Sequence, residues 1–147
     1  TITEELYDKV LDVNLKGPFR LSALVGTRMA ATDAGGSIIF VSSIASQRPS
    51  PNELVYGAAK AGINNLTYGL SRTLGPKVRV NCIVPGPFLT DISKAWDLDA
   101  FNERAAEAYA LERGGKPSEI VGAALYLASD ASSYTTGALI DINGGPR

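Results

Sequence analysis

Two short apolar runs, at residues 37–41 and 78–84, are the feature that most constrains the fold. The first run is too short for a helix and is rich in branched and aromatic side chains, as in strands buried within a parallel sheet. Between the runs, apolar residues recur at helical spacing: Ile63, Leu66, Leu70 and Leu74. We therefore expect a helix over residues 53–74 and an α/β fold with a parallel sheet.

Helical patterns also flank the two runs. Residues 3–31 predict a long helix with a kink at residues 14–18, because Pro18 removes one hydrogen bond and crowds the preceding turn. Residues 91–113 predict one or two short helices, and residues 138–142 a last strand. Another helix is expected from residue 116 to 128, with these residues facing inward: Ile120, Val121, Ala124, Leu125 and Leu127.

Three polar residues stand where a parallel sheet binds its ligands. Ser43 follows the first strand, and ligands of such sheets lie outside the carboxyl ends of the strands. Tyr56 and Lys60 are four residues apart near the start of the next helix and so share a face. A neighbouring ammonium favours the phenolate form, so the phenol could act as a general acid or base. Ser43 could donate a hydrogen bond to a carbonyl oxygen, and together the three residues indicate carbonyl–alcohol chemistry.

Simpler interpretations remain open for each residue. Tyr68 also precedes a cation, Arg72, by four residues, and that pair is more typical of a solvated helix face. The Tyr-x-x-x-Lys spacing is therefore weak evidence when taken alone. Ser42 and Ser43 could simply cap a strand, and Asn14 could be a polar surface residue.

Composition excludes several classes of function. The chain has no His, which excludes a Ser-His or Cys-His catalytic centre and a His-ligated metal. Fifteen acidic and fourteen basic residues give a net charge of −1, and no basic run indicates nucleic acid as a partner. The single cysteine, Cys82, lies within the second strand, where a buried thiol is expected. With no apolar stretch long enough to span a membrane, the sequence predicts a soluble, cytoplasmic protein without a metal site.

These motifs together resemble the short-chain dehydrogenase/reductase family. The family has Ser at the end of a strand, Tyr-x-x-x-Lys opening the next helix, and Pro-Gly with a following Thr after the next strand. In this sequence the corresponding residues are Ser43, Tyr56, Lys60, Pro85, Gly86 and Thr90. Asn14 matches the family's helix Asn, residues 113–120 match its C-terminal region, and the similarity extends over essentially the whole chain. Asn143 stands where the family usually has Asp.

The resemblance implies a Rossmann-type doubly wound parallel sheet, of which the chain would supply the last three strands with their flanking helices. Residues 1–147 would be the C-terminal portion of a single NAD(P)-binding domain, with a substrate lid at about residues 88–113. Trp96 could line the substrate pocket or fasten the lid.

The resemblance also implies an oxidoreductase that transfers hydride between NAD or NADP and a small-molecule carbonyl or secondary alcohol. Tyr56 would pass the proton, Ser43 would steady the carbonyl oxygen, and Asn14 would sustain a proton relay. Lys60 would hold the nicotinamide ribose and lower the pKa of Tyr56. Cofactor contacts are implied for Tyr56, Lys60, Pro85, Gly86, Phe88 and Thr90. A homo-oligomer, dimer or tetramer, is implied as well.

One expected motif is missing. No G-x-x-x-G-x-G or G-x-G-x-x-G follows a strand, although Rossmann-type domains use such a turn to bind the cofactor pyrophosphate. We therefore expect the chain to be a piece of a longer protein. The alternative hypothesis is a non-catalytic binding or assembly module. The coding sequence upstream of Thr1 would distinguish them, because the enzyme requires a strand and a glycine-rich turn there.

The isolated 147-residue chain should be inactive, prone to association, and able to bind dinucleotide only weakly or not at all. The reason is that a sheet without its usual neighbour leaves an unpaired apolar edge. Titration with NADH and NADPH, followed by nicotinamide fluorescence, tests this expectation. Micromolar binding would contradict it.

Overall fold

The computed structural model describes residues 2–147, and for Ile92 it describes the backbone alone. The helices are α1 (Glu4–Leu11), α2 (Gly17–Ala30), α3 (Leu54–Leu74), α4 (Leu98–Ala108) and α5 (Val121–Ala128). The strands are β1 (Gly36–Val41), β2 (Val78–Pro85) and β3 (Leu139–Ile142). A π-helical turn, η1 (Asp12–Lys16), joins α1 to α2, and the 3₁₀ turns are η2 (Ile44–Ser46), η3 (Asp91–Ala95), η4 (Pro117–Ile120) and η5 (Asp130–Ser132). The predicted helices and strands are confirmed, with ends that differ by a few residues.

Within residues 2–147, the strands form one parallel sheet in the order β1-β2-β3. Gly36 pairs with Val78 at one end of β1, and Val41 pairs with Ile83 at the other. Cys82 of β2 pairs with Leu139 of β3. Because β2 is central and is covered on both faces, residues on both of its faces are buried, including the polar Asn81.

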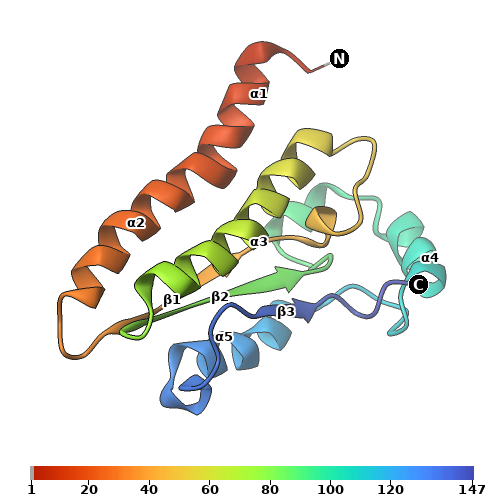
Figure 1. Ribbon diagram of the computed structural model, residues 1–147. Helices are drawn as coiled ribbons and strands as arrows, with labels where there is room; N and C mark the ends of the chain where they lie inside the picture. The colour runs from red at the N-terminus through yellow and green to blue at the C-terminus, as the bar shows by residue number, and fades with distance from the viewer. Residues whose placement is uncertain (1) are drawn as a thin grey trace.

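Helices cover both faces of this sheet (Figure 1). The segment from α1 to α2 and helix α3 lie on one face, α5 lies on the other, and α4 lies beyond the carboxyl ends of the strands. Helix α3 packs on β2, and α2 packs on both β1 and α3. This arrangement confirms the α/β fold class with a doubly wound parallel sheet.

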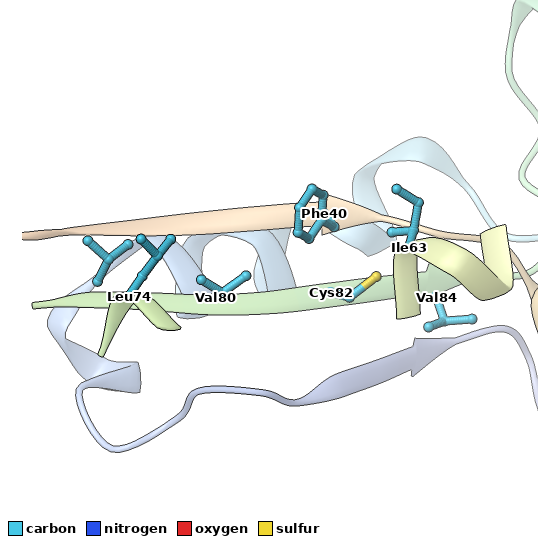
Figure 2. Packing of buried hydrophobic residues seen from close by; sticks show 7 residues of the cluster. Phe40, Ile63, Leu74, Val80, Cys82 and Val84 are labelled. Carbon is cyan, nitrogen blue, oxygen red and sulfur yellow. The ribbon is translucent and has the colours of Figure 1, made fainter. Parts of the chain in front are cut away.

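The hydrophobic core lies mainly between α3 and the sheet, as Figure 2 shows. Its buried members are Phe40, Ile63, Leu74, Val78, Val80, Cys82 and Val84. Leu66 and Leu70 are partly buried against this cluster, so the apolar stripe predicted for α3 does face the core. Cys82 is a buried free thiol, as predicted. Burial raises the pKa of Cys82 to about 11, so the thiol is neutral at physiological pH.

The predicted kink before Pro18 is a π-helical turn rather than a break. The N–H of Gly17 donates to the carbonyl of Asp12, five residues earlier, and Pro18 lies in the first turn of α2. Proline has no N–H for the carbonyl one turn before it, and the wider π turn lets the helix continue past this position.

The inward-facing prediction for α5 is only partly right. Leu127 is fully buried, but 48% of Val121 and 64% of Leu125 are exposed. Helix α5 covers β1 and β2, and only the side of the helix toward that sheet is buried. The apolar sequence of α5 therefore does not reveal which of its residues contact the sheet.

Apolar side chains are also exposed along α1, η1 and α2, including Leu6, Val13, Leu21 and Leu24. None of the helices in residues 2–147 combines the length and apolarity needed to cross a membrane.

Replacing Asn81 by Leu should lower the free energy of unfolding. Asn81 is fully buried; its Nδ2 donates to the carbonyl of Thr135 at 2.8 Å, and its Oδ1 accepts from the N–H of Ala138 at 3.0 Å. Leu has the same branched shape but is larger, and it leaves both main-chain groups without this partner, which should cost about 2 kcal/mol. Urea unfolding of the full-length chain measures the change, with exposed Asn65→Leu on α3 as the control. Equal stability of the two variants would contradict the prediction.

Candidate functional site

A groove of about 1280 Å³ lies at the carboxyl ends of β1 and β2. Ser43 and Ile44, just after β1, line one part of it, and residues 85–88, at the end of β2, line another. The first turn of α3 and the segment carrying Trp96 and Tyr109 form further walls. This position is the one expected for a ligand site in an open parallel sheet.

The two serines after β1 have different surroundings. Ser42 is buried, and its Oγ donates to the carbonyl of Lys60 at 3.0 Å. Ser43 lines the groove, and its Oγ accepts from the N–H of Ala45 at 3.2 Å. That bond uses a lone pair of the Ser43 hydroxyl and leaves its proton for another acceptor. Of the two serines, Ser43 is therefore the one able to donate to a ligand in the groove.

Tyr56 lines the same groove from the first turn of α3. The Nζ of Lys60 lies 5.5 Å from the centroid of the Tyr56 ring, within the range of a cation–π contact. The same Nζ donates to the carbonyl of Val41 at 3.0 Å, so Lys60 also ties α3 to the end of β1. Lys60 is not among the residues that line the groove. Burial lowers the pKa of the Lys60 ammonium from its ordinary value.

Asn14 is not among the groove residues either. It lies in η1, half-buried, and its Nδ2 donates to the carbonyl of Val10 at 3.0 Å. The π turn packs closely on α3, because a Cβ at Gly62 would come within 2.7 Å of Leu15. Glycine at this position therefore permits η1 to approach the helix that carries Lys60.

The predicted cofactor residues after β2 lie together. Pro85, Gly86, Phe88 and Thr90 all line the groove. A Cβ at Gly86 would come within 2.8 Å of the Asn143 Cα, so only glycine permits this close packing of the turn on the segment after β3. Asn143, the predicted departure from the family pattern, accepts a hydrogen bond from the N–H of Gly145 at 3.1 Å.

The region predicted as a lid contains η3 and α4, and one of its aromatic residues has two roles. Trp96 lines the groove, and its ring packs against Phe101 at a centroid distance of 5.3 Å. Trp96 thus lines the groove and also packs on α4, within the region predicted as a lid. Sequence reasoning missed the groove positions of Ile2, Leu6 and Val10, because helical periodicity does not distinguish a groove wall from a packed face.

A charged pair fixes the end of this region. Arg113 donates to both carboxylate oxygens of Glu119, at 2.6 and 2.8 Å, and the N–H of Lys116 donates to Glu119 at 2.7 Å. The hydrogen bonds from Arg113 are the main reason that the pKa of Glu119 falls to about 2. Arg113 and Glu119 also line a smaller cavity of about 90 Å³ next to Phe88. The N–H of Gly115 donates to the carbonyl of Pro87 at 2.9 Å, which joins the segment with the Arg113–Glu119 pair to the turn after β2.

Comparison with known proteins gives consistent matches over the whole chain. The sequence profile of a family described as "Enoyl-(Acyl carrier protein) reductase" matches residues 1–146. The 3-oxoacyl-[acyl-carrier-protein] reductase FabG of Chlamydia trachomatis is 41% identical over 145 residues, which are 98% of this chain and 58% of the relative. Human dehydrogenase/reductase SDR family member 4 is 36% identical over 146 residues, 98% of this chain and 52% of the relative.

The fold comparison agrees with the sequence comparison. The crystal structure of an Agrobacterium tumefaciens dehydrogenase with bound NADP superposes with a TM-score of 0.91 and 31% identity. The match covers 97% of this chain and 59% of that structure. The chain thus spans little more than half the length of the proteins that it matches.

Stability at acid pH should depend on Glu119. The Glu119 carboxylate has a pKa of about 2 in the folded state and about 4.3 in the unfolded state. It therefore stabilises the fold at pH values above its unfolded-state pKa. That stabilisation is lost as pH falls toward the folded value. Between about pH 5 and 3, the melting temperature of the full-length chain should therefore fall more steeply than that of its Glu119→Gln variant.

Exposed Glu103 on α4 gives the matched control. Its Gln variant should keep the steep pH dependence of the unmodified chain. Parallel curves for the Glu119 variant and the unmodified chain would show that the charged pair adds no stability.

Proposed function

The chain belongs to the short-chain dehydrogenase/reductase family, and on this premise we propose that its full-length form is an NAD(P)-dependent oxidoreductase. Its reaction is hydride transfer between the nicotinamide and a small-molecule carbonyl or secondary alcohol. The observation that carries the proposal is the shared groove of Ser43 and Tyr56, with the Lys60 ammonium beside the Tyr56 ring. This arrangement offers two hydroxyl groups to one substrate oxygen.

Tyr56 is the proton-transferring residue in this proposal. During carbonyl reduction its phenol donates a proton to the substrate oxygen, and during alcohol oxidation the phenolate accepts it. The Lys60 ammonium stabilises the negative charge that the phenolate carries. Lys60 has the Val41 carbonyl as a fixed acceptor, so its head group is held near the phenol without a partner carboxylate.

Ser43 donates its hydroxyl proton to the substrate oxygen, on which negative charge develops during reduction. The N–H of Ala45 fixes the position of the Ser43 Oγ. Asn14 sustains the proton relay from η1, which packs on α3, the helix that carries Lys60. Because Pro18 has no N–H, a main-chain carbonyl in the preceding turn is left to hold a water molecule beside η1.

The residues after β2 fit the nicotinamide end of such a cofactor. Pro85, Gly86, Phe88 and Thr90 form a groove wall next to Tyr56, and Lys60 would contact the ribose. When bound, the nicotinamide would supply or accept the hydride. Either NAD or NADP is compatible with these residues. Residues 88–113 serve as the substrate lid, with Trp96 on its inner side.

We further propose a cytoplasmic homo-oligomer, dimer or tetramer. The exposed apolar residues of α1 and α2, such as Leu21 and Leu24, together with the family relationship, support self-association.

Replacing Tyr56 by Phe in the full-length protein should lower kcat by about 100-fold or more, since the variant has no proton to transfer. Cofactor affinity should be retained, because the ring and Lys60 remain. The chain offers a matched control in Tyr68→Phe, which removes the same hydroxyl from an exposed position on the same helix.

Steady-state kinetics with a ketone panel and fluorescence titration of NADPH and NADH give the two readouts. Turnover retained by the Tyr56 variant, or lost equally in the Tyr68 variant, would overturn the proposed chemistry.

A further inference from the structure

The last residues of the chain lie between two walls of the groove. We define the tail as residues 143–147, which follow β3. One wall is the loop that follows η2 and contributes Pro51 and Asn52, and the other is the lid with Trp96 and Tyr109. The tail is hydrogen-bonded to both of these segments.

On the lid side, the contacts are main-chain hydrogen bonds and one ion pair, between Arg147 and Glu112 at 3.4 Å. The N–H groups of Ala110 and Leu111 donate to the carbonyls of Gly145 and Gly144, at 2.7 and 3.0 Å. The N–H of Arg147 donates to the carbonyl of Ala108, at 2.8 Å. The tail therefore pairs with the chain on both sides of Tyr109, which lines the groove.

On the loop side, the contact is one side chain. The guanidinium of Arg48 donates from Nη1 to the carbonyl of Arg147 at 2.8 Å and from Nη2 to that of Pro146 at 3.0 Å. Its neighbour Gln47 donates to the Asp141 carboxylate of β3 at 3.1 Å. Two donors in a fixed plane match two successive carbonyls, which the single ammonium of Lys cannot do.

We propose that Arg48 is a positioning residue that holds the lid in place over the substrate part of the groove. Arg48 binds the tail, and the tail in turn binds the lid. The inference rests on the proposed function for its effect on substrate. Arg48 itself does not line the groove, so its effect passes through the tail to Tyr109. The cofactor side of the groove, at residues 85–88, meets the start of the tail, where Gly86 packs on Asn143, whereas Arg48 holds the last two residues of the tail. Loss of Arg48 should therefore affect substrate more than cofactor.

The test compares Arg48→Gln, Arg48→Lys and the control Arg72→Gln in the full-length protein. Arg72 is an exposed residue of α3 outside both the groove and the lid, so its variant makes the same charge change away from the site. Arg48→Gln should raise the substrate KM about 5-fold or more, with kcat and the cofactor KM within about 2-fold of the unmodified enzyme. Arg48→Lys should recover part of the loss, and Arg72→Gln should match the unmodified enzyme.

Hydrogen exchange supplies a readout that needs no turnover. In Arg48→Gln, the amides of Ala110 and Leu111 should exchange faster, because the tail that accepts from them is no longer held. Amides of β2 should keep their protection.

Each result decides the inference. Unchanged exchange at these two amides, an unchanged substrate KM, or an equal rise in the cofactor KM would overturn the positioning role. Faster exchange throughout the chain would assign Arg48 to general stability and would also overturn it. An unmodified full-length protein without NAD(P)-dependent turnover would instead overturn the proposed function, while the exchange data would still test the link between Arg48 and the lid.

Discussion

The parallel pairing of β1 with β2 is the constraint on which the site depends. It brings the ends of two strands that are distant in sequence to one edge of the sheet. Ser43 follows one strand and residues 85–88 lie at the end of the other, so both reach the same groove. Helices cover β2 on both faces, and burial of its apolar side chains there stabilises the pairing.

Helix α3 makes the stability of the fold and the geometry of the site inseparable. Its first half carries Tyr56 and Lys60, and its second half places Ile63 and Leu74 in the core. Lys60 contributes to both, because its Nζ is near the Tyr56 ring and also bonded to the Val41 carbonyl of β1. Packing of the helix on the sheet thus sets the position of the phenol. The core therefore positions the residue proposed to transfer the proton without lying next to it.

Sequence patterns predicted the strands and the helices, because hydrophobic periodicity is a local property. The choice of Ser43 over Ser42 came instead from the family resemblance, through the thirteen-residue step to Tyr56. The patterns did not predict that Lys60 donates to the carbonyl of Val41, which lies nineteen residues earlier at the end of β1. They also failed for Val121 and Leu125, since apolar sequence alone does not tell which side of a helix meets the sheet. The bond between Arg48 and the tail spans most of the chain, and no local signal in the sequence marks it.

The π-helical turn between α1 and α2 holds one residue more than an α-helical turn, and each residue of a helix corresponds to about 100° of rotation. The turn therefore sets the angular phase between two helices that otherwise form one rod. With that phase, α1 directs Val10 toward the groove, while α2 directs Ser22 and Gly26 toward the interior. A chain shortened by one residue within Asp12–Lys16 would keep its helical content but lose this match. The number of residues in this segment is thus a constraint on the fold in its own right.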